Sequence, residues 1–395
     1  MPGRSAAKEA VASPIESARS LAPRIASAAP EIERGRRLPA ELARAMAELG
    51  LFRMLVPRAF GGLEVGPETM IETIAEIARA DGSAGWCLAI GVTSGVMSAY
   101  LPEPAAREIY GDPGAITGGV FHPRGRAVVD GSRYRVSGRW PFASGCENCT
   151  WLMGGCLVFD AAEDRRPRSR PSGSPEARLV LFRAGEAEIL DTWTVSGLRG
   201  TGSHDIAVTD LPVPVERSAW LADPPVQSGP LYAFPVFGLL ALGIAAVALG
   251  IGRGAMEDVL ALAGEKVPTG GRRALAERQA VQAQVARAEA LLRAARAHLL
   301  DAVGDAWRCA LGGAPFSLRT RALLRIAATD AVRSAAQAVD LLYEVGGATS
   351  IYDTSALQRR FRDIHTATQH AMVAPPTYEL AGRVLLGLEA DVELL

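Results

Sequence analysis

The chain has 395 residues, 49% of them hydrophobic, and a formal net charge of −1 at pH 7. This length is sufficient for two or three domains with substantial cores, and the balanced charge excludes the basic field that nucleic acid or an acidic membrane surface would attract. Five cysteines, an odd number, do not suit a disulfide framework. The N-terminus lacks the apolar segment of a secretory signal, so we expect a cytoplasmic protein.

Residues 1–114 are predicted to form an N-terminal helical domain. Apolar residues recur at helical spacing in LPAELARAMAELGLFRML, and the Pro- and Gly-containing segment VPRAFGG that follows predicts a turn. The stretch PETMIETIAEIARADGSAGWCLAIGVTSGVMSAYL predicts one helix, an interruption at DGSAG, and a second, more apolar helix.

Residues 115–222 are predicted to form a central antiparallel β-barrel. The segment AITGGVFHPRGRAVVDGSRYRVSGRWPFASG is rich in Val, Tyr, Phe and Trp and is divided by DGS and SGR, which is typical of strands joined by tight turns. The same texture continues through CTWLMGGCLVF and ARLVLFRA to VPVERS.

Residues 223–395 are predicted to form a C-terminal four-helix bundle. The uncharged stretch FPVFGLLALGIAAVALGIG, residues 234–252, is almost long enough to cross a bilayer. Charged residues continue the same helical pattern, however, and no second apolar span follows, so we predict a helix buried inside the bundle. The fold class is therefore α+β, with helices, a barrel and helices in chain order.

This order of domains, with three of its segments, resembles the acyl-CoA dehydrogenase superfamily. ELGLFRMLVPRAFGG is similar to that superfamily's N-terminal helix and turn, and LAERQAVQAQVARAEALLRAA to its dimer-forming helix. LLYEVGGATSIYDTSALQRRFRDIH is similar to the C-terminal segment beside the flavin. Such a resemblance implies the fold but does not fix the reaction.

The residues at the active positions depart from those of true dehydrogenases. Where the family has a Trp-Ile-Thr strand whose Thr touches flavin N5, this chain reads RWPFASG, which places Phe142 at the Trp and Ser144 at the Thr. Where most members carry the catalytic Glu, the chain has Ala371, which cannot accept a proton. A dehydrogenase would need a relocated base, and Glu257 and Glu265 are two candidates that nothing else marks out.

The motifs GRWPFASGC, GLRGTGSHD and HTATQH resemble instead the oxygenase components of two-component flavin-dependent monooxygenases. The nearest resemblance is to relatives of p-hydroxyphenylacetate hydroxylase, dibenzothiophene monooxygenase and bacterial indole hydroxylases. It implies that reduced flavin and O2 form a C4a-hydroperoxide that hydroxylates an aromatic or heteroaromatic small molecule, with Ser144 and His370 facing the flavin. An imidazole with a pKa of about 6.5 can accept a phenol or indole proton near neutral pH, or position the peroxide proton.

The same resemblance implies where the cofactor is held. The family binds the flavin phosphate with an Arg from a neighbouring subunit, placed just before an L-x-x-x-Q helix, and it assembles as a homotetramer of two dimers. FMN and FAD both stay open as the cofactor, because Tyr343 replaces a Gln of the dehydrogenases. The candidate cofactor-binding residues are Phe142, Ala143, Ser144, Thr201, Ser203, Arg272, Arg273, Gly346 and Gly347.

Several other residues have two interpretations. His122 either meets the substrate and takes part in catalysis, or is an exposed turn histidine before Pro123. Trp86 and Phe121 either line an aromatic substrate pocket or pack in the core. His204 lies near the flavin edge or faces solvent, and for His365 we expect a hydrogen-bonding role rather than catalysis.

No metal site or nucleotide-binding domain is predicted. The CxxC of Cys146 and Cys149 has no second pair at zinc spacing, which favours buried thiols on a strand. No GxGxxG motif for NAD(P)H appears, so a separate NAD(P)H:flavin reductase must supply reduced flavin. A catalytically inactive helical oligomer is a third alternative, against which the pairing of Ser144 with His370 argues.

Overall fold

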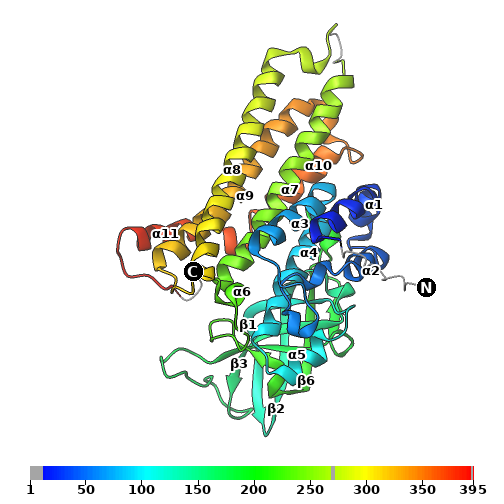
Figure 1. The fold of residues 1–395 in the computed structure, drawn as a ribbon. Coiled ribbons are helices and arrows are strands. Elements are labelled where there is room, and N and C mark those ends of the chain that lie inside the picture. Colours follow the sequence, from blue (N-terminus) through cyan, green and yellow to red (C-terminus); the bar gives the residue numbers. More distant parts are fainter. Residues whose placement is uncertain (1–11, 268–271, 393–394) are drawn as a thin grey trace, which may run out of the picture.

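The computed structural model describes residues 12–267, 272–392 and 395, arranged in three parts (Figure 1). The N-terminal helices lie between the sheet and the long C-terminal helices. They are α1 (Pro14–Gly35), α2 (Ala40–Glu48), α3 (Pro67–Ala80), α4 (Gly82–Ser94) and α5 (Glu103–Tyr110).

The predicted interruption at DGSAG is confirmed as the junction between α3 and α4. Asp81 is extended, with φ −152° and ψ 129°, and its side chain accepts a hydrogen bond from the backbone N–H of Ala84 at 2.9 Å. A carboxylate in this position satisfies one of the unpaired amides of the first helical turn. The cap therefore ends one helix and starts the next within two residues.

The central sheet has seven strands in the spatial order β5-β6-β2-β1-β3-β4-β7. Strand β1 pairs with β3 in parallel, and the other neighbouring pairs are antiparallel. The strands are β1 (Thr117–Asp130), β2 (Arg133–Ala143), β3 (Trp151–Phe159), β4 (Ala177–Arg183), β5 (Glu188–Leu190), β6 (His204–Pro214) and β7 (Ser218–Ala219).

The prediction of an antiparallel barrel was therefore wrong in two respects. The sheet is mixed, and in the described residues β5 and β7 end the strand order at opposite edges without pairing. The chain reverses after β1 and again around the short 3-10 turn Cys146–Asn148, so β3 runs in the direction of β1 and pairs on its other side. Alternation and turn residues predict where strands lie along the chain, but they do not specify on which side a strand adds.

The C-terminal helices α7, α8, α9 and α10 pack along one another, as a bundle requires, and α11 packs against α9 (Figure 1). The bounds are α6 (Pro230–Ala233), α7 (Val236–Glu265), α8 (Gln279–Leu311), α9 (Leu318–Gly346), α10 (Ala356–Ala367) and α11 (Pro376–Leu385).

Helix α7 contains residues 236–252 of the uncharged stretch described above. By length and composition it could cross a membrane, but 78% of its most apolar window is buried within the protein. It packs against α3, α4, α9 and α10. The prediction of a buried bundle helix is confirmed, and the uncharged sequence reflects contact with protein on several sides.

Two glycines of α7 provide a matched test of this packing. A Cβ at Gly250 would meet the Ala75 carbonyl oxygen and lie 2.6 Å from the Ala78 Cβ, whereas a Cβ at Gly264 has no neighbour within 4 Å. We predict that Gly250→Ala lowers the free energy of unfolding by about 1–3 kcal/mol through overpacking. Gly264→Ala should raise it by up to about 1 kcal/mol through helix propensity. Chemical denaturation of both variants checks this, and equal effects of the two substitutions would contradict the packing described.

Candidate active site

A β-bulge at the end of β2 positions Ser144. Trp140 pairs with Ile206 and Ala143 with His204, so two residues of β2 lie opposite Asp205 alone. The extra residue falls at Phe142, which has φ 68° and leaves its side chain 67% exposed. Positive φ in a bulky residue costs roughly 1–3 kcal/mol and is concentrated at functional sites.

A chain of buried hydrogen bonds runs through Ser144. Trp86 Nε1 donates to Ser144 Oγ at 3.0 Å, and Ser144 Oγ lies 2.7 Å from Ser203 Oγ. Ser203 Oγ lies 2.7 Å from Thr201 Oγ1, which donates to the carbonyl oxygen of Leu198 at 2.8 Å. Trp86 comes from α4, Ser144 from the end of β2, and the other three residues from the turn before β6.

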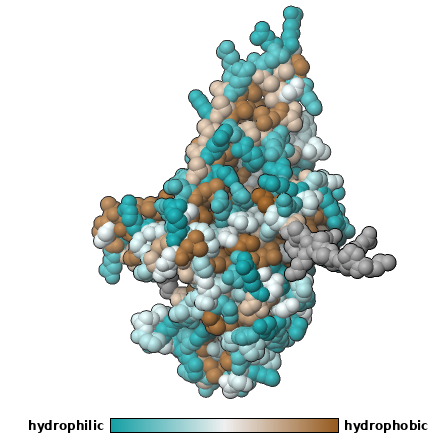
Figure 2. All heavy atoms as spheres, viewed as in Figure 1, coloured by the Kyte–Doolittle hydropathy of each residue, from teal (hydrophilic) through white to brown (hydrophobic). Residues whose placement is uncertain are grey.

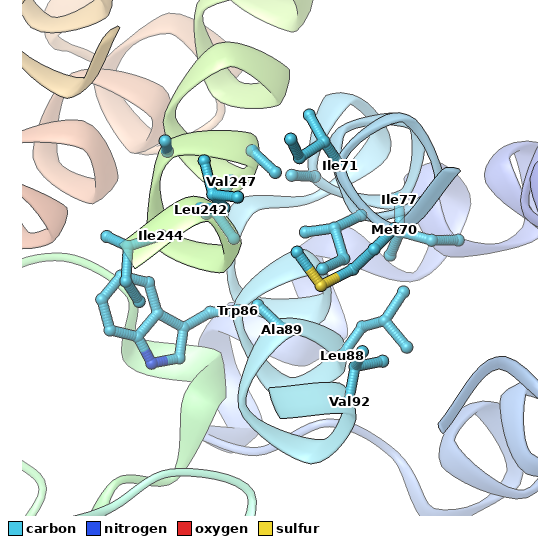
Figure 3. Packing of buried hydrophobic residues seen from close by; sticks show 14 of the residues in the cluster. Met70, Ile71, Ile77, Trp86, Leu88, Ala89, Val92, Leu242, Ile244 and Val247 are labelled. Carbon is cyan, nitrogen blue, oxygen red and sulfur yellow. The ribbon is translucent and has the colours of Figure 1, made fainter. Parts of the chain in front are cut away.

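Trp86 also connects this chain to His370. The two rings make an edge contact, with centroids 5.5 Å apart and an interplanar angle of 69°. Figure 3 shows the indole extending from α4 to lie beside Ile244 of α7. Trp86 was predicted to contact substrate or to pack in the core; it is buried, and it positions Ser144 and His370.

His370 follows α10 and precedes the short 3-10 turn Ala371–Val373. Its Nδ1 accepts a hydrogen bond from the backbone N–H of Met372 at 3.3 Å. Loss of solvent around the half-buried ring, reinforced by the positive charge of Arg325, lowers the pKa of His370 to about 4. The ring is therefore neutral at pH 7, and because Nδ1 accepts, Nε2 carries the proton.

Of the two roles expected for His370, the lowered pKa favours positioning a proton over accepting one. A neutral imidazole with Nε2–H is a hydrogen-bond donor, and its weak basicity disfavours net proton abstraction near neutral pH. Arg325 of α9 is a buried cation whose Nη2 donates to the Met372 carbonyl oxygen at 2.9 Å. It therefore holds the turn beside His370 and adds to the effect of burial, which is the main reason why the imidazole is uncharged. Arg325 could not be recognised from the sequence, because an arginine on an amphipathic helix resembles any surface arginine.

Asp363 of α10 anchors the turn that carries the hydroxyl chain. Its Oδ1 accepts a hydrogen bond from the backbone N–H of Leu198 at 2.6 Å, and Leu198 adopts φ 51°. Burial, and secondly the charge of Asp81, raise the pKa of Asp363 to about 7. One helix thus holds the turn with Ser203 and, at its end, presents His370.

The candidate bases for a dehydrogenase lie elsewhere. Ala371 supplies no carboxylate, as its sequence position implied. Glu257 is half exposed and accepts a hydrogen bond from Arg79 Nη1 at 2.8 Å. Glu265 is exposed at the last position of α7. The relocated-base alternative has no support from either residue.

Comparison with known proteins agrees with this geometry. Residues 15–106 match the acyl-CoA dehydrogenase N-terminal domain and residues 242–375 match the C-terminal domain. The indole-3-acetate monooxygenase of Pseudomonas putida is 34% identical over 90% of this chain and 89% of its own. The oxygenase subunit HsaA of a flavin-dependent monooxygenase from Mycobacterium tuberculosis is 31% identical over 93% of this chain and 94% of its own. The chain belongs to the flavin-dependent monooxygenases of the acyl-CoA dehydrogenase superfamily.

Solved structures show the same relationship. The 3-HSA hydroxylase from Rhodococcus sp. RHA1 superposes with a TM-score of 0.89 at 26% identity, covering 97% of this chain and 99% of its own. XiaF from Streptomyces sp., solved with FADH2 and glycerol, has a TM-score of 0.86 at 26% identity over 96% of both chains. The resemblance inferred from the motifs is confirmed at the level of family and fold.

In this monooxygenase the predicted cofactor residues form two separate groups. One group is at the hydroxyl chain and consists of its members Ser144, Thr201 and Ser203 with the adjacent Phe142 and Ala143. The other group is at the far end of α7, where Lys266 Nζ donates to the Gly346 carbonyl oxygen at 2.8 Å.

This second group holds Gly347, directly after Gly346, and the exposed Arg272 and Arg273 a few residues beyond Lys266. Ile244, beside Trp86, lies 21 residues before the end of α7 at Glu265, which is about 32 Å at 1.5 Å per residue. Within one chain, the structure does not bring the two groups together.

The aromatic and histidine candidates on β1 belong to another cluster. Phe121 stacks on Trp220 with centroids 4.8 Å apart and meets the edge of Phe237 at 5.4 Å. His122 is exposed, as one interpretation expected, but it lies within strand β1 rather than in a turn. In the part of the chain that the structure describes, neither residue hydrogen bonds or stacks with a member of the Ser144 chain.

The remaining histidines and cysteines have structural roles. His204 is buried, and its Nδ1 accepts from the backbone N–H groups of Thr192 and Trp193, both at 3.2 Å, so the interpretation that it faces solvent was wrong. His365 hydrogen bonds Asp340 at 2.8 Å, as expected of a non-catalytic residue. Cys146 and Cys149 are free thiols on a 3-10 turn and the residue after it, not on a strand. No metal-binding cluster occurs among the residues that the structure describes.

The raised pKa of Asp363 predicts a pH-dependent stability. Because the folded state binds this proton more tightly than the unfolded chain does, the free energy of unfolding should fall as pH rises from about 4 to about 7. The slope per proton is at most about 1.4 kcal/mol per pH unit. Asp363→Asn keeps an acceptor for Leu198 but does not ionise, so its denaturation curves should show a flatter dependence. Asp130→Asn, at the exposed end of β1, is the control; identical slopes in the wild type and Asp363→Asn would contradict the assignment.

Proposed function

We propose that this chain is the oxygenase component of a two-component flavin-dependent monooxygenase that hydroxylates an aromatic or heteroaromatic small molecule. The observation that carries the proposal is the buried chain ending at Ser144, joined through Trp86 to a neutral His370. Ser144 stands where a dehydrogenase has its threonine, and Ala371, next to His370, stands where it has its catalytic carboxylate. This set can position oxygen and exclude water, but it cannot act as a strong base.

The residues around Ser144 fit a flavin ring. After its bonds to Trp86 and Ser203, the hydroxyl oxygen has one bonding position left, which suits a ring nitrogen such as N5. Phe142, strained and exposed beside it, offers an aromatic edge or face to the same ring. When bound, reduced FMN or FAD supplies the activation of O2, and a separate NAD(P)H:flavin reductase delivers it.

His370 then acts on the substrate side of the flavin. Its Nε2–H donates a hydrogen bond to an oxygen atom held between the flavin and the substrate. Because the pKa of His370 is about 4, this donor is present throughout the pH range from 6 to 8. The aromatic cluster of Phe121, Trp220 and Phe237 is our candidate wall for the substrate ring, with His122 beside it.

The function is tested by supplying the protein with a flavin reductase, NADH, FMN or FAD, and aromatic candidates such as indole-3-acetate and resorcinol. These are the compounds named for relatives at 34% and 29% identity. We expect a product one oxygen atom heavier by mass spectrometry. We also expect a transient absorbance change when the anaerobically reduced mixture meets O2. Flavin reduction by an acyl-CoA thioester without oxygen insertion would contradict the proposal.

His370→Ala tests the role of the imidazole. Loss of one preorganised donor costs roughly 10²–10³ in rate, so product formation should fall by that factor while reduced flavin still binds. His298→Ala is the matched control, because His298 is an exposed residue of α8 bonded to Asp330. Normal turnover by His370→Ala would show that the residue has no part in the reaction.

We propose further that the functional unit is a cytoplasmic homotetramer. Support comes from the two groups of cofactor residues, which are far apart along α7 and which a neighbouring chain would have to bring together. Exposed leucines gather on and after α11, at Leu385, Leu386 and Leu388, where Figure 2 shows apolar residues on the surface. Exposed apolar groups of this kind mark protein contacts.

Leu386→Glu tests this surface. Leu386 is 76% exposed in the single chain, so the substitution should leave folding intact but reduce the mass measured by light scattering or sedimentation. Val226→Glu, at a residue 58% exposed near the sheet, should leave the mass unchanged. A monomeric wild type, or an unchanged mass in Leu386→Glu, would contradict an interface at α11.

A further inference from the structure

The hydroxyl chain beside Ser144 has a fixed direction. Its last acceptor is the Leu198 carbonyl oxygen, which can only accept, so the single hydroxyl hydrogen of Thr201 points to Leu198. Ser203 must then donate its own hydrogen to Thr201, because the two oxygens are 2.7 Å apart and Thr201 has no second hydrogen.

Counting hydroxyl hydrogens in the same way determines the direction of the bond between Ser144 and Ser203. Since Ser203 has already donated, Ser144 must be the donor in the 2.7 Å bond between them. Trp86 Nε1 donates to Ser144 and occupies one of its two acceptor positions. One acceptor position and no hydrogen remain on Ser144.

Further hydrogen bonds hold the acceptor at the Leu198 end in place. The Leu198 carbonyl oxygen also accepts from the backbone N–H of Thr201 at 3.2 Å and from Trp193 Nε1 at 3.0 Å. Asp363 holds the Leu198 N–H at 2.6 Å. All three hydroxyl side chains are buried, so water cannot readily replace a bond that is broken. For Ser144 to donate outward, every hydroxyl in the chain must rotate and the bond from Thr201 to Leu198 must be given up.

We propose that Ser203 and Thr201 restrict Ser144 to accepting a hydrogen bond and thereby make the site select reduced over oxidised flavin. The inference rests on the proposed function, in which Ser144 faces flavin N5. Reduced flavin carries a hydrogen on N5 and matches the acceptor. Oxidised flavin presents a lone pair there, which an oxygen without a free hydrogen cannot satisfy. Ser203 and Thr201 are positioning residues. They orient the hydroxyl of Ser144 and so determine which redox state of the flavin binds more tightly.

This selection suits an enzyme fed by a separate reductase. A site that binds both redox states equally would be occupied by oxidised flavin whenever that form is in excess. A site that prefers N5–H captures the reduced form and releases the oxidised form after each turnover. The selectivity from one hydrogen bond is roughly tenfold.

Ser203→Ala is the direct test. Without Ser203 Oγ, the hydrogen of Ser144 is free to turn toward N5, so oxidised flavin should bind roughly tenfold more tightly while the affinity for reduced flavin changes little. Both dissociation constants are measured by fluorescence titration, anaerobically for the reduced form. Equivalently, the midpoint potential of the bound flavin should fall by about 30 mV, the value of a tenfold change for two electrons.

Three further variants distinguish an effect of hydrogen-bond direction from a general effect on side-chain packing. Thr201→Val removes the anchor of the chain and should act like Ser203→Ala, whereas Thr201→Ser keeps a hydroxyl and should retain the wild-type ratio of the two dissociation constants. Ser144→Ala removes the acceptor itself and should weaken reduced flavin instead of strengthening oxidised flavin. A purely structural defect would weaken both redox states together.

The outcomes distinguish this inference from the proposed function. If the wild type binds neither redox state, the flavin assignment itself fails. If the wild type binds reduced flavin and forms product, but Ser203→Ala leaves the ratio of the two dissociation constants unchanged, only the directional role of Ser203 and Thr201 is overturned. A tighter complex with oxidised flavin in Ser203→Ala, reproduced in Thr201→Val and absent in Thr201→Ser, supports the proposal.

Discussion

One serine hydroxyl joins the three parts of this protein. Ser144 ends a strand of the central sheet, accepts a hydrogen bond from Trp86 of the N-terminal helices, and reaches α10 of the C-terminal bundle through Ser203, Thr201 and Leu198. Each link is short and buried, and buried polar groups are costly to leave without partners. The positions of the three parts are therefore coupled to the hydrogen-bonding state of a single oxygen atom.

Several features that cost stability are concentrated around this oxygen. The strand bulges at Phe142 with a positive φ, Leu198 is left-handed, and Asp363 is a carboxyl buried beside another acid. Natural proteins usually show such departures from local preference where function requires them. The apolar contacts of α7 with α3, α4 and α9 supply the compensating packing. The packing of the bundle thus stabilises a fold in which the residues around Ser144 remain strained.

The order of the helical and strand regions and the candidates Ser144 and His370 follow from the sequence, whereas features that depend on three-dimensional context do not. Ser144 and His370 were candidates because the short motifs around them resemble those of flavin-dependent monooxygenases, which is a local signal. Asp363 could not be recognised in this way, since nothing in the sequence reveals that its carboxyl meets a backbone amide 165 residues away. The pKa of His370 depends on burial and on Arg325, and neither can be read from spacing. The parallel pairing of β1 and β3 escaped prediction because turn residues do not specify the side on which a strand adds.

The most direct measurement is a crystal structure of the anaerobic complex with reduced flavin. The account predicts N5 at about 3 Å from Ser144 Oγ, with the ring beside Phe142, His370 Nε2 on the side open to substrate, and the phosphate held by a neighbouring chain. A flavin whose N5 points away from Ser144, or one bound wholly within a single chain, would contradict it.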